Sequence, residues 1–330
     1  MKYQYIESLK ETETTCIFCN WSEKPPKYTI TIPTYKRKEL LQYAIESALN
    51  QKSFSDYEIL VLDNNPIRND EGELVMKQFM HTPHIAYYKN QENLGIINNL
   101  NKLGLIARTE WLVMLHSDDM LYPDFLLNVN KIVKEMNPSA IFTEDMIVRT
   151  SDDYKPIRDS NQKIKLTKLK RGDYMLWNVG CNPVGLTARR LSILELGGYD
   201  PIYGSAGDMN LNYKLATIGQ TFLLRGYPLT CYRWMDNETL KRGVIEDITR
   251  NAAKIRINIL SEILPILPQR IVLQVIRYQE AKELLALKGA KIASINSKEK
   301  LIRCLCHIIR FFLNFRRKWR FMSAKQIKHL

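Results

Sequence analysis

Several signals that would place a protein in a special class are missing from this chain. Residues 1–10 are polar and lack the apolar core of a secretory signal peptide, so we expect a cytoplasmic protein with reduced thiols. Cys16 and Cys19 form a CxxC pair, but no second Cys or His pair at zinc spacing accompanies it. We therefore expect no metal or redox role for this pair. No short-period repeat or low-complexity segment is visible.

Acidic residues are almost absent from the last tenth of the chain. Residues 298–330 hold ten Lys and Arg residues and one acid, Glu299, and so contribute +9 of the formal net charge of +13. Large apolar residues recur between the basic ones, but no uncharged run reaches the ~20 residues that a bilayer span requires. The pattern predicts a basic amphipathic helix on an anionic membrane surface, which places the protein peripherally on the inner face of the cell membrane. A helix packed on its own domain is the alternative.

The remaining sequence has the composition of a globular protein, with 45% hydrophobic and 25% charged residues. Apolar runs that end in turn residues alternate with segments of helical spacing. The expected strands and helices alternate in the order 28–33, 40–49, 58–62, 72–80, 85–88, 95–107, 112–115 and 125–133. This alternation predicts an α/β fold whose mostly parallel sheet is flanked by helices.

The second half of the chain has a less regular pattern. In order, we expect a strand at 140–148, a polar surface excursion at 151–171, a strand at 185–188, helices at 191–196 and 208–219, and a strand-like segment at 221–234. From residue 241 onward the pattern is helical. We divide the chain into an N-terminal extension (1–26), a main domain (27–238, with halves 27–122 and 123–238) and a C-terminal helical region (239–330).

The strongest chemical signal is the run 112–123. Its apolar residues lead directly to Asp118 and Asp119, and Pro123 then opens a helical pattern. A buried strand here would deliver both carboxylates to the edge of the sheet where open α/β folds bind ligands. Adjacent acids there are costly unless they hold a cation or a polar ligand, so the run indicates a divalent metal that carries a phosphorylated substrate. For the dipeptide alone, a solvated turn is the alternative.

Five segments together resemble the inverting glycosyltransferases of family 2, which have the GT-A fold. In chain order they are TITIPTYKR at 29–37, EILVLDN at 58–64, the Asn-x-Gly helix opening at 93–101, LHSDD at 115–119, and GGYD followed by SAGDMNL at 197–211. Each segment alone is a weak signal, but five in this order are a strong one. The resemblance covers residues 28–219 and excludes the N-terminal extension and the C-terminal region.

The resemblance implies a metal-dependent inverting enzyme of bacterial-type polysaccharide biosynthesis. It would move a sugar from a nucleotide diphosphate sugar, by family frequency a UDP-sugar, to a hydroxyl of a glycan or lipid-linked acceptor. Asp119, together with Asp118, would bind Mn²⁺ or Mg²⁺, and Asp208 would be the general base. Direct displacement with one base predicts inversion at the anomeric carbon. Asp118 would alternatively bind the ribose hydroxyls.

The resemblance also implies a nucleotide-binding set. Tyr35 would stack on the base, Asp63 would accept an N–H from a uracil-like edge, and Arg37 or Lys36 would meet a phosphate. Asn93 and Gly95 would shape the backbone close to the donor. The complete set is Pro33, Thr34, Tyr35, Arg37, Asp63, Asn93, Gly95 and Asp118.

Two other classes of protein stay open at this point. One is a catalytically inactive sugar-nucleotide binding or scaffold protein, against which the intact Asp118, Asp119 and Asp208 argue. The other is a nucleic-acid-binding protein that uses the basic tail. Because the basic residues of the tail alternate with large apolar ones, we expect no nucleic-acid partner.

Overall fold

A computed structural model of the protein describes residues 3–148, 163–176, 183–234, 241–263, 272–278, 280–281, 284 and 325–326. Its main sheet has ten strands, of which the four central neighbours β4, β3, β2 and β5 run parallel. The order across the sheet is β1 (Thr14–Cys19), β4 (Ile85–Asn90), β3 (Tyr57–Asp63), β2 (Tyr28–Thr34), β5 (Trp111–Met114), β10 (Thr187–Arg189), β7 (Ala140–Thr143), β11 (Thr221–Arg225), β9 (Lys165–Leu169) and β13 (Lys325–Gln326).

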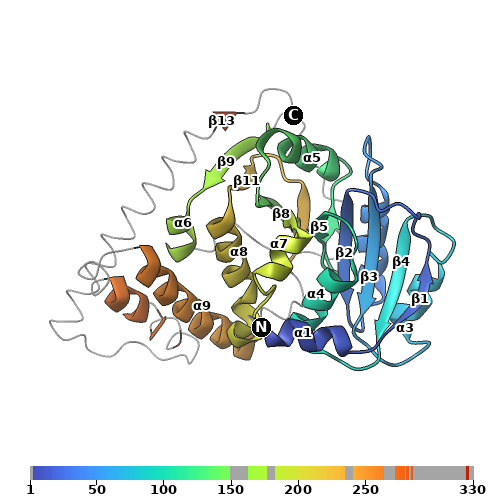
Figure 1. The fold of residues 1–330 in the computed structure, drawn as a ribbon, viewed down its shortest axis with the longest axis horizontal. Coiled ribbons are helices and arrows are strands. Elements are labelled where there is room, and N and C mark those ends of the chain that lie inside the picture. The colour runs from blue at the N-terminus through green and yellow to red at the C-terminus, as the bar shows by residue number, and fades with distance from the viewer. Residues whose placement is uncertain are drawn as a thin grey trace.

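Helices cover both faces of this sheet (Figure 1). They are α1 (Gln4–Glu11), α2 (Glu39–Leu49), α3 (Glu71–Lys77), α4 (Gly95–Ile106), α5 (Phe125–Met136), α6 (Arg171–Leu176), α7 (Arg190–Glu195), the 3₁₀ helix η1 (Pro201–Ala206), α8 (Gly207–Ile218) and α9 (Arg242–Ile263). The predicted alternation of strands and helices is therefore confirmed, as is the α/β fold class.

Two apolar cores lie on opposite faces of the sheet. In β3, Leu60 and Leu62 enter one core, whereas Ile59 and Val61 enter the other. The first core is closed by α4, α7, α8 and α9, and the second by α2, α3 and α5. Because both faces are covered, β3 and β5 are nearly continuous apolar runs in the sequence, whereas β2 alternates Thr with Tyr and Ile.

Two predicted strands were wrong in extent, because each divides between two sheets. Residues 140–148 form β7 and then β8 (Asp145–Val148), and residues 221–234 form β11 and then β12 (Thr230–Arg233). The division occurs where the Glu144 carboxylate accepts a hydrogen bond from the backbone N–H of Gly226, whose φ of 84° bends the chain. The second parts, β8 and β12, pair with β6 (Met120–Leu121) in a separate three-stranded sheet.

The prediction of a polar excursion at 151–171 was wrong for its C-terminal part. Residues 165–169 form β9, which pairs antiparallel with β11. Its Lys residues at 165 and 168 are exposed, while Leu166, Thr167 and Leu169 are buried. The charges thus mark the solvent side of a strand rather than a loop. Residues 149–162 lie outside the described residues.

The N-terminal extension is integrated into the fold. Strand β1 pairs antiparallel with β4, and helix α1 packs on α4, where the Lys102 ammonium donates to the carbonyls of Leu9 and Thr12 at 2.7 and 2.8 Å. At the start of α4, Ile96 is 62% exposed, because the buried face of α4 is formed by Leu100 and Leu103.

Helix α9 is the described beginning of the predicted C-terminal helical region and packs on η1, α6 and α8 (Figure 1). The predicted amphipathic helix at 298–330 falls outside the described residues, apart from the two residues of β13. In the part of the chain that the structure describes, no helix combines the length and the apolar character that crossing a bilayer demands.

Candidate active site

Three loops that follow parallel strands meet at one edge of the main sheet. Strands β3, β2 and β5 are neighbours, and Thr34 at the end of β2 lies in register with Asp63 at the end of β3. The segments that follow them therefore leave the sheet on the same side, as expected for a ligand site in an α/β fold. An ion pair between the guanidinium of Arg37 and the carboxylate of Asp118, at 3.6 Å, joins the loop after β2 to the loop after β5.

His116, Asp118 and Asp119 form a cluster after β5. Ligand atoms of these three residues all lie within 4.8 Å of one another. The backbone N–H of Asp119 donates to the carbonyl of His116 at 3.1 Å, so a tight turn brings the side chains together. The next two residues form β6, which pairs with β12, and Arg233 at the end of β12 donates its backbone N–H to Asp119 Oδ1 at 2.9 Å.

The electrostatics of this cluster suit a divalent cation. Among the described residues, Asp119 Oδ2 and His116 Nε2 are buried and have no hydrogen-bond partner. Burial raises the pKa of Asp119 well above its usual range, and the charge of Asp118 adds to this rise. Burial lowers the pKa of His116, which favours the neutral imidazole that binds metals. Two carboxylates and a neutral imidazole with unsatisfied atoms therefore fit Mn²⁺ or Mg²⁺, the cations that the resemblance implied.

The sequence prediction included Asp118 and Asp119 in this cluster and missed His116. Its position, three residues before Asp119, was the available signal. The imidazole lies close to the two carboxylates only because of the turn after β5, which the sequence pattern did not predict.

The loop after β2 presents an aromatic ring to solvent. Tyr35 is 41% exposed, and the Lys36 ammonium lies 5.1 Å from the centre of its ring. Lys36 adopts φ = 52°, a left-handed conformation that is costly for a residue with a side chain. Pro33 and Thr34 complete β2, and Thr34 Oγ1 is buried without a hydrogen-bond partner among the described residues. A strained loop with an exposed ring and an unsatisfied hydroxyl is suited to ligand binding.

Asp63 is already engaged by protein groups. Its Oδ1 accepts from the backbone N–H of Asn65 at 2.9 Å, and its Oδ2 accepts from the hydroxyl of Tyr87 at 2.8 Å and the ammonium of Lys89 at 3.0 Å. Burial raises the pKa of Asp63, and these hydrogen bonds counteract that rise. The predicted contact with a base stays a prediction, for which a second lone pair of Oδ1 is the acceptor that these bonds leave.

Lys89 is the centre of a buried ionic network. Besides Asp63, its ammonium contacts Asp70 at 2.9 Å and Glu73 at 3.7 Å, and its side chain is 2% exposed. Glu73 in turn pairs with Arg68 at 3.0 Å. The network fixes α3 against the end of β3. It was not predicted, because Lys89 lies one residue beyond the predicted strand 85–88 and was assigned no role.

Asn93 and Gly95 shape the start of α4. Asn64 Oδ1 accepts from the backbone N–H of Leu94 at 2.9 Å, and the side-chain amide of Asn64 donates to Asn93 Oδ1 at 2.7 Å. The backbone N–H of Gly95 donates to Asn93 Oδ1 at 2.9 Å, and Gly95 adopts φ = 73°. These contacts join the loop after β4 to the end of β3, beside Asp63.

Asp208 is the second residue of α8 and is half-buried. Its Oδ1 accepts from the backbone N–H of Met209 at 2.7 Å. A Cβ atom placed on the preceding Gly207 would lie 3.4 Å from Ile97 Cδ1, so the start of α8 packs on the first turn of α4. Asp208 therefore lies beside the helix start that Asn93 and Gly95 shape.

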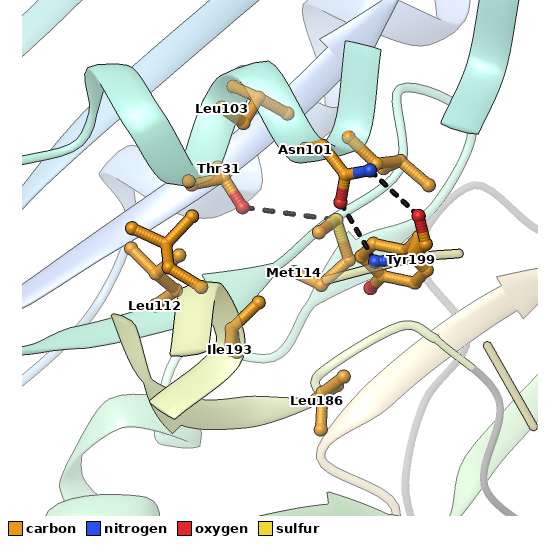
Figure 2. A pocket seen from close by; sticks show the side chains of 11 residues that line it. Thr31, Asn101, Leu103, Leu112, Met114, Leu186, Ile193 and Tyr199 are labelled. Carbon is orange, nitrogen blue, oxygen red and sulfur yellow. Dashed lines mark hydrogen bonds between the residues drawn. The ribbon is translucent and has the colours of Figure 1, made fainter. Parts of the chain in front are cut away.

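Asn101 fixes the chain that leads to Asp208. Its side-chain amide donates to the carbonyl of Tyr199 at 2.7 Å and accepts from the N–H of Tyr199 at 2.8 Å, which clamps this backbone to α4 (Figure 2). Burial and the charge of Asp208 raise the pKa of the Tyr199 hydroxyl. The surrounding pocket in Figure 2 is mostly apolar, with Leu103, Leu112 and Ile193 on its walls, and belongs to the core rather than to the site.

The α/β architecture belongs to the GT-A class of folds. Residues 1–349 of Staphylococcus aureus TarS, solved in complex with UDP-GlcNAc, superpose with a TM-score of 0.56 at 13% sequence identity, over 79% of this chain and 73% of that chain. The model of the family described as glycosyl transferase family 2 matches residues 29–197, more than half of the chain. The chain therefore belongs to this family.

Curated relatives align over shorter segments. The poly(ribitol-phosphate) beta-N-acetylglucosaminyltransferase TarP of Staphylococcus aureus (strain N315) is 29% identical over 117 residues, 35% of each chain. The GalNAc(5)-diNAcBac-PP-undecaprenol beta-1,3-glucosyltransferase of Campylobacter jejuni is 35% identical over 97 residues, which are 29% of this chain and 31% of the relative. The chain thus spans about a third of the length of these relatives.

Proposed function

We propose that the protein is a metal-dependent, inverting glycosyltransferase that moves a sugar from a UDP-sugar to a hydroxyl of a glycan or lipid-linked acceptor. The observation that carries this proposal is the His116–Asp118–Asp119 cluster, with its unsatisfied buried Asp119 Oδ2 at the ligand-binding edge of the sheet. The UDP-GlcNAc complex of TarS and the undecaprenol-linked substrate in the Campylobacter jejuni enzyme's name support the donor and acceptor classes.

The donor lies across the loops that follow β2, β3 and β5. Tyr35 stacks on the base, and Asp63 accepts its N–H with the remaining lone pair of Oδ1. Arg37 lies 3.6 Å from Asp118, at the place where both a phosphate and a ribose would be held. Asn93 and Gly95 keep the start of α4 open for the sugar, because a Cβ atom on Gly95 would meet no atom within 4 Å.

Asp118, Asp119 and His116 would hold the divalent cation. When bound, the cation neutralises charge on the departing diphosphate. In this arrangement Asp119 is the best-oriented ligand, because Arg233 fixes Oδ1 and leaves Oδ2 toward the cluster. Asp118 is divided between the cation and Arg37.

Asp208 is the general base on the acceptor side. It takes the proton of the acceptor hydroxyl as the oxygen attacks the anomeric carbon. The bond to the diphosphate breaks as the new glycosidic bond forms on the opposite face of the sugar, so the configuration inverts. The packing of α8 on the first turn of α4 supports this role, because the sugar of the donor would lie beside that turn.

The variant Asp208→Asn tests the base. We expect kcat to fall about 10²–10⁴-fold, the usual contribution of a general base, while the Kd of UDP stays unchanged. Glu195→Gln, which alters an exposed acid at the end of α7, is the matched control and should behave as the wild type. Equal losses of UDP binding and turnover in Asp208→Asn would contradict the assignment. An inactive scaffold would bind UDP and turn over no donor in any variant.

The basic segment 298–330 supports a peripheral position on an anionic membrane. Flotation with vesicles that contain phosphatidylglycerol should carry the full chain, whereas neutral vesicles should not. Replacing Arg316, Arg317 and Lys318 by Gln should weaken flotation. Equal flotation with both kinds of vesicle, or binding to DNA alone at matched salt, would contradict this position.

A further inference from the structure

Helix α9 lies outside the residues that the family model matches, yet it holds the loop that leads to Asp208. The carboxylate of Asp247 on α9 accepts a hydrogen bond from the backbone N–H of Ser205 at 2.7 Å. Ser205 belongs to η1. Helix α8 follows η1 directly and carries Asp208 in its first turn. A single hydrogen bond thus connects α9 to the backbone three residues ahead of Asp208.

The Asp247 carboxylate is itself oriented from within α9. Its Oδ1 accepts from the side-chain amide of Asn251 at 2.7 Å, and the Lys254 ammonium donates to Asn251 Oδ1 at 3.0 Å. A second contact reaches η1 about three turns further along α9, where the side-chain amide of Asn258 donates to the hydroxyl of Tyr203 at 3.1 Å. Helix α9 therefore contacts η1 through hydrogen bonds at two separate points.

The loop that Asp247 holds has an unusual backbone. Gly204 adopts φ = 44° and ψ = −127°, a conformation that residues with a side chain rarely adopt. A Cβ atom at this position would lie 2.5 Å from Asp247 Oδ2. Strained conformations persist where surrounding contacts over-determine them and occur often beside catalytic groups. The Ser205–Asp247 hydrogen bond is such a contact.

From these contacts we infer that Asp247 is a positioning residue, which sets the place of the Asp208 carboxylate by fixing η1. The inference rests on the proposed role of Asp208 as the base. Without the Asp247 carboxylate, the backbone N–H of Ser205 loses its acceptor and Gly204 can relax, which shifts the first turn of α8. A displacement of about 1 Å at a catalytic group can cost about 10²-fold in rate.

The test compares kcat and KM in the full-length enzyme. In Asp247→Ala we expect kcat to fall about 10- to 100-fold, with the KM for the donor within about twofold, because Asp247 lies away from the strand ends that bind the donor. Asp247→Asn keeps an acceptor oxygen for Ser205 and should restore much of kcat. The control is Glu246→Gln, its neighbour on α9, which pairs with Arg242 at 3.7 Å and should leave both constants unchanged.

Thermal melting separates positioning from stability alone. Unchanged kcat in Asp247→Ala, measured below its melting temperature, together with a lowered melting temperature would overturn the inference. If Asp247→Ala does not fold, the variant Gly204→Ala tests the inference instead. It should lower kcat without raising the KM for the donor, and a wild-type kcat in Gly204→Ala would overturn the inference. If Asp208→Asn retains activity, the assignment of Asp208 as the base is wrong. If Asp208→Asn is inactive but Asp247→Ala is fully active, only the positioning role of Asp247 is wrong.

Discussion

The donor side and the acceptor side of the site are held in different ways. On the donor side, most contacts join residues less than about 30 positions apart, such as Asn64 with Asn93 and Asp63 with Lys89. On the acceptor side, Asn101 clamps Tyr199 from 98 positions away, and Asp247 reaches back over 42 positions to Ser205. The donor geometry is therefore a property of consecutive strand ends, whereas the acceptor geometry depends on helices that approach from elsewhere in the chain.

Two contacts on the donor side also join distant residues. One is the ion pair between Arg37 and Asp118. In the other, Arg233, 114 positions after Asp119, donates its backbone N–H to the carboxylate that we assign to the cation. The small sheet of β6, β12 and β8 thus supports the donor side at Asp119, whose carboxylate is buried.

The largest effect should come from the donor side. Asp119→Ala removes the proposed principal metal ligand and should lower kcat/KM more than about 10³-fold, because the cation supplies several kcal/mol of charge stabilisation. Mn²⁺ binding, followed by isothermal titration calorimetry, should weaken in parallel. Glu71→Gln, an exposed acid in the first turn of α3, is the control and should bind Mn²⁺ normally. Wild-type Mn²⁺ affinity in Asp119→Ala would contradict the proposal that this cluster binds the cation.

Lys89→Met tests whether the donor side depends on its buried ionic network. Removing the Lys89 ammonium leaves Asp63 and Asp70 without their ionic partner, while Glu73 keeps Arg68, so we expect about 3–5 kcal/mol lower stability toward urea. Lys77→Met, on the exposed side of α3, should change stability by less than about 0.5 kcal/mol. Similar urea midpoints for the two variants would show that the network is not a determinant of the fold.

Asn101→Ala makes the corresponding test on the acceptor side. It leaves the buried N–H and carbonyl of Tyr199 without partners, at a cost of about 1–3 kcal/mol for each group. We expect lower stability toward urea together with a lower kcat and an unchanged donor KM. A raised donor KM instead would show that the clamp serves the donor loops and would break the comparison between the two sides.

The smallest effect is on the pH dependence of stability. The hydrogen bond with Arg68, aided by the Asn69 N–H and the charge of Lys89, lowers the pKa of Glu73 from 4.5 to about 2. Since this pKa is lower in the folded than in the unfolded protein, the resulting stability is present above pH 4.5 and is lost as the pH falls toward 2. Asp63, whose pKa is raised by burial, contributes in the opposite direction.

Urea unfolding between pH 5 and pH 2 checks this sign. The wild type should lose stability across the interval, and Glu73→Gln should lose less of it, because the glutamine does not titrate. Parallel curves for the two proteins would mean that the Glu73 carboxylate is not stabilised in the folded state.

Local sequence patterns predicted most of the sheet and the place of the acidic cluster. The strands over 28–34, 57–63 and 111–114 are apolar runs that end in turn residues, and parallel neighbours must end at one edge. Features that depend on distant contacts were not predictable in this way. The division of 140–148 between two sheets occurs where Glu144 contacts the distant Gly226. The sequence of β9 resembles a loop because its Lys residues face solvent.

The same limit applies to the site residues. Asp119 and Asp208 follow from motifs within a few residues of themselves, whereas the roles of Lys89, Asn101 and Asp247 appear only when their partners are brought close. His116 lies between these cases, because it is in the motif but needs the turn after β5 to join the cluster.

The central claim is that the enzyme transfers sugar with a cation held by His116, Asp118 and Asp119. The most direct measurement is sugar release or transfer from a panel of nucleotide sugars by the full chain, in EDTA and after adding Mn²⁺ or Mg²⁺. We predict turnover of at least one UDP-sugar that EDTA abolishes and the added cation restores. Full turnover of that donor in excess EDTA would contradict the account.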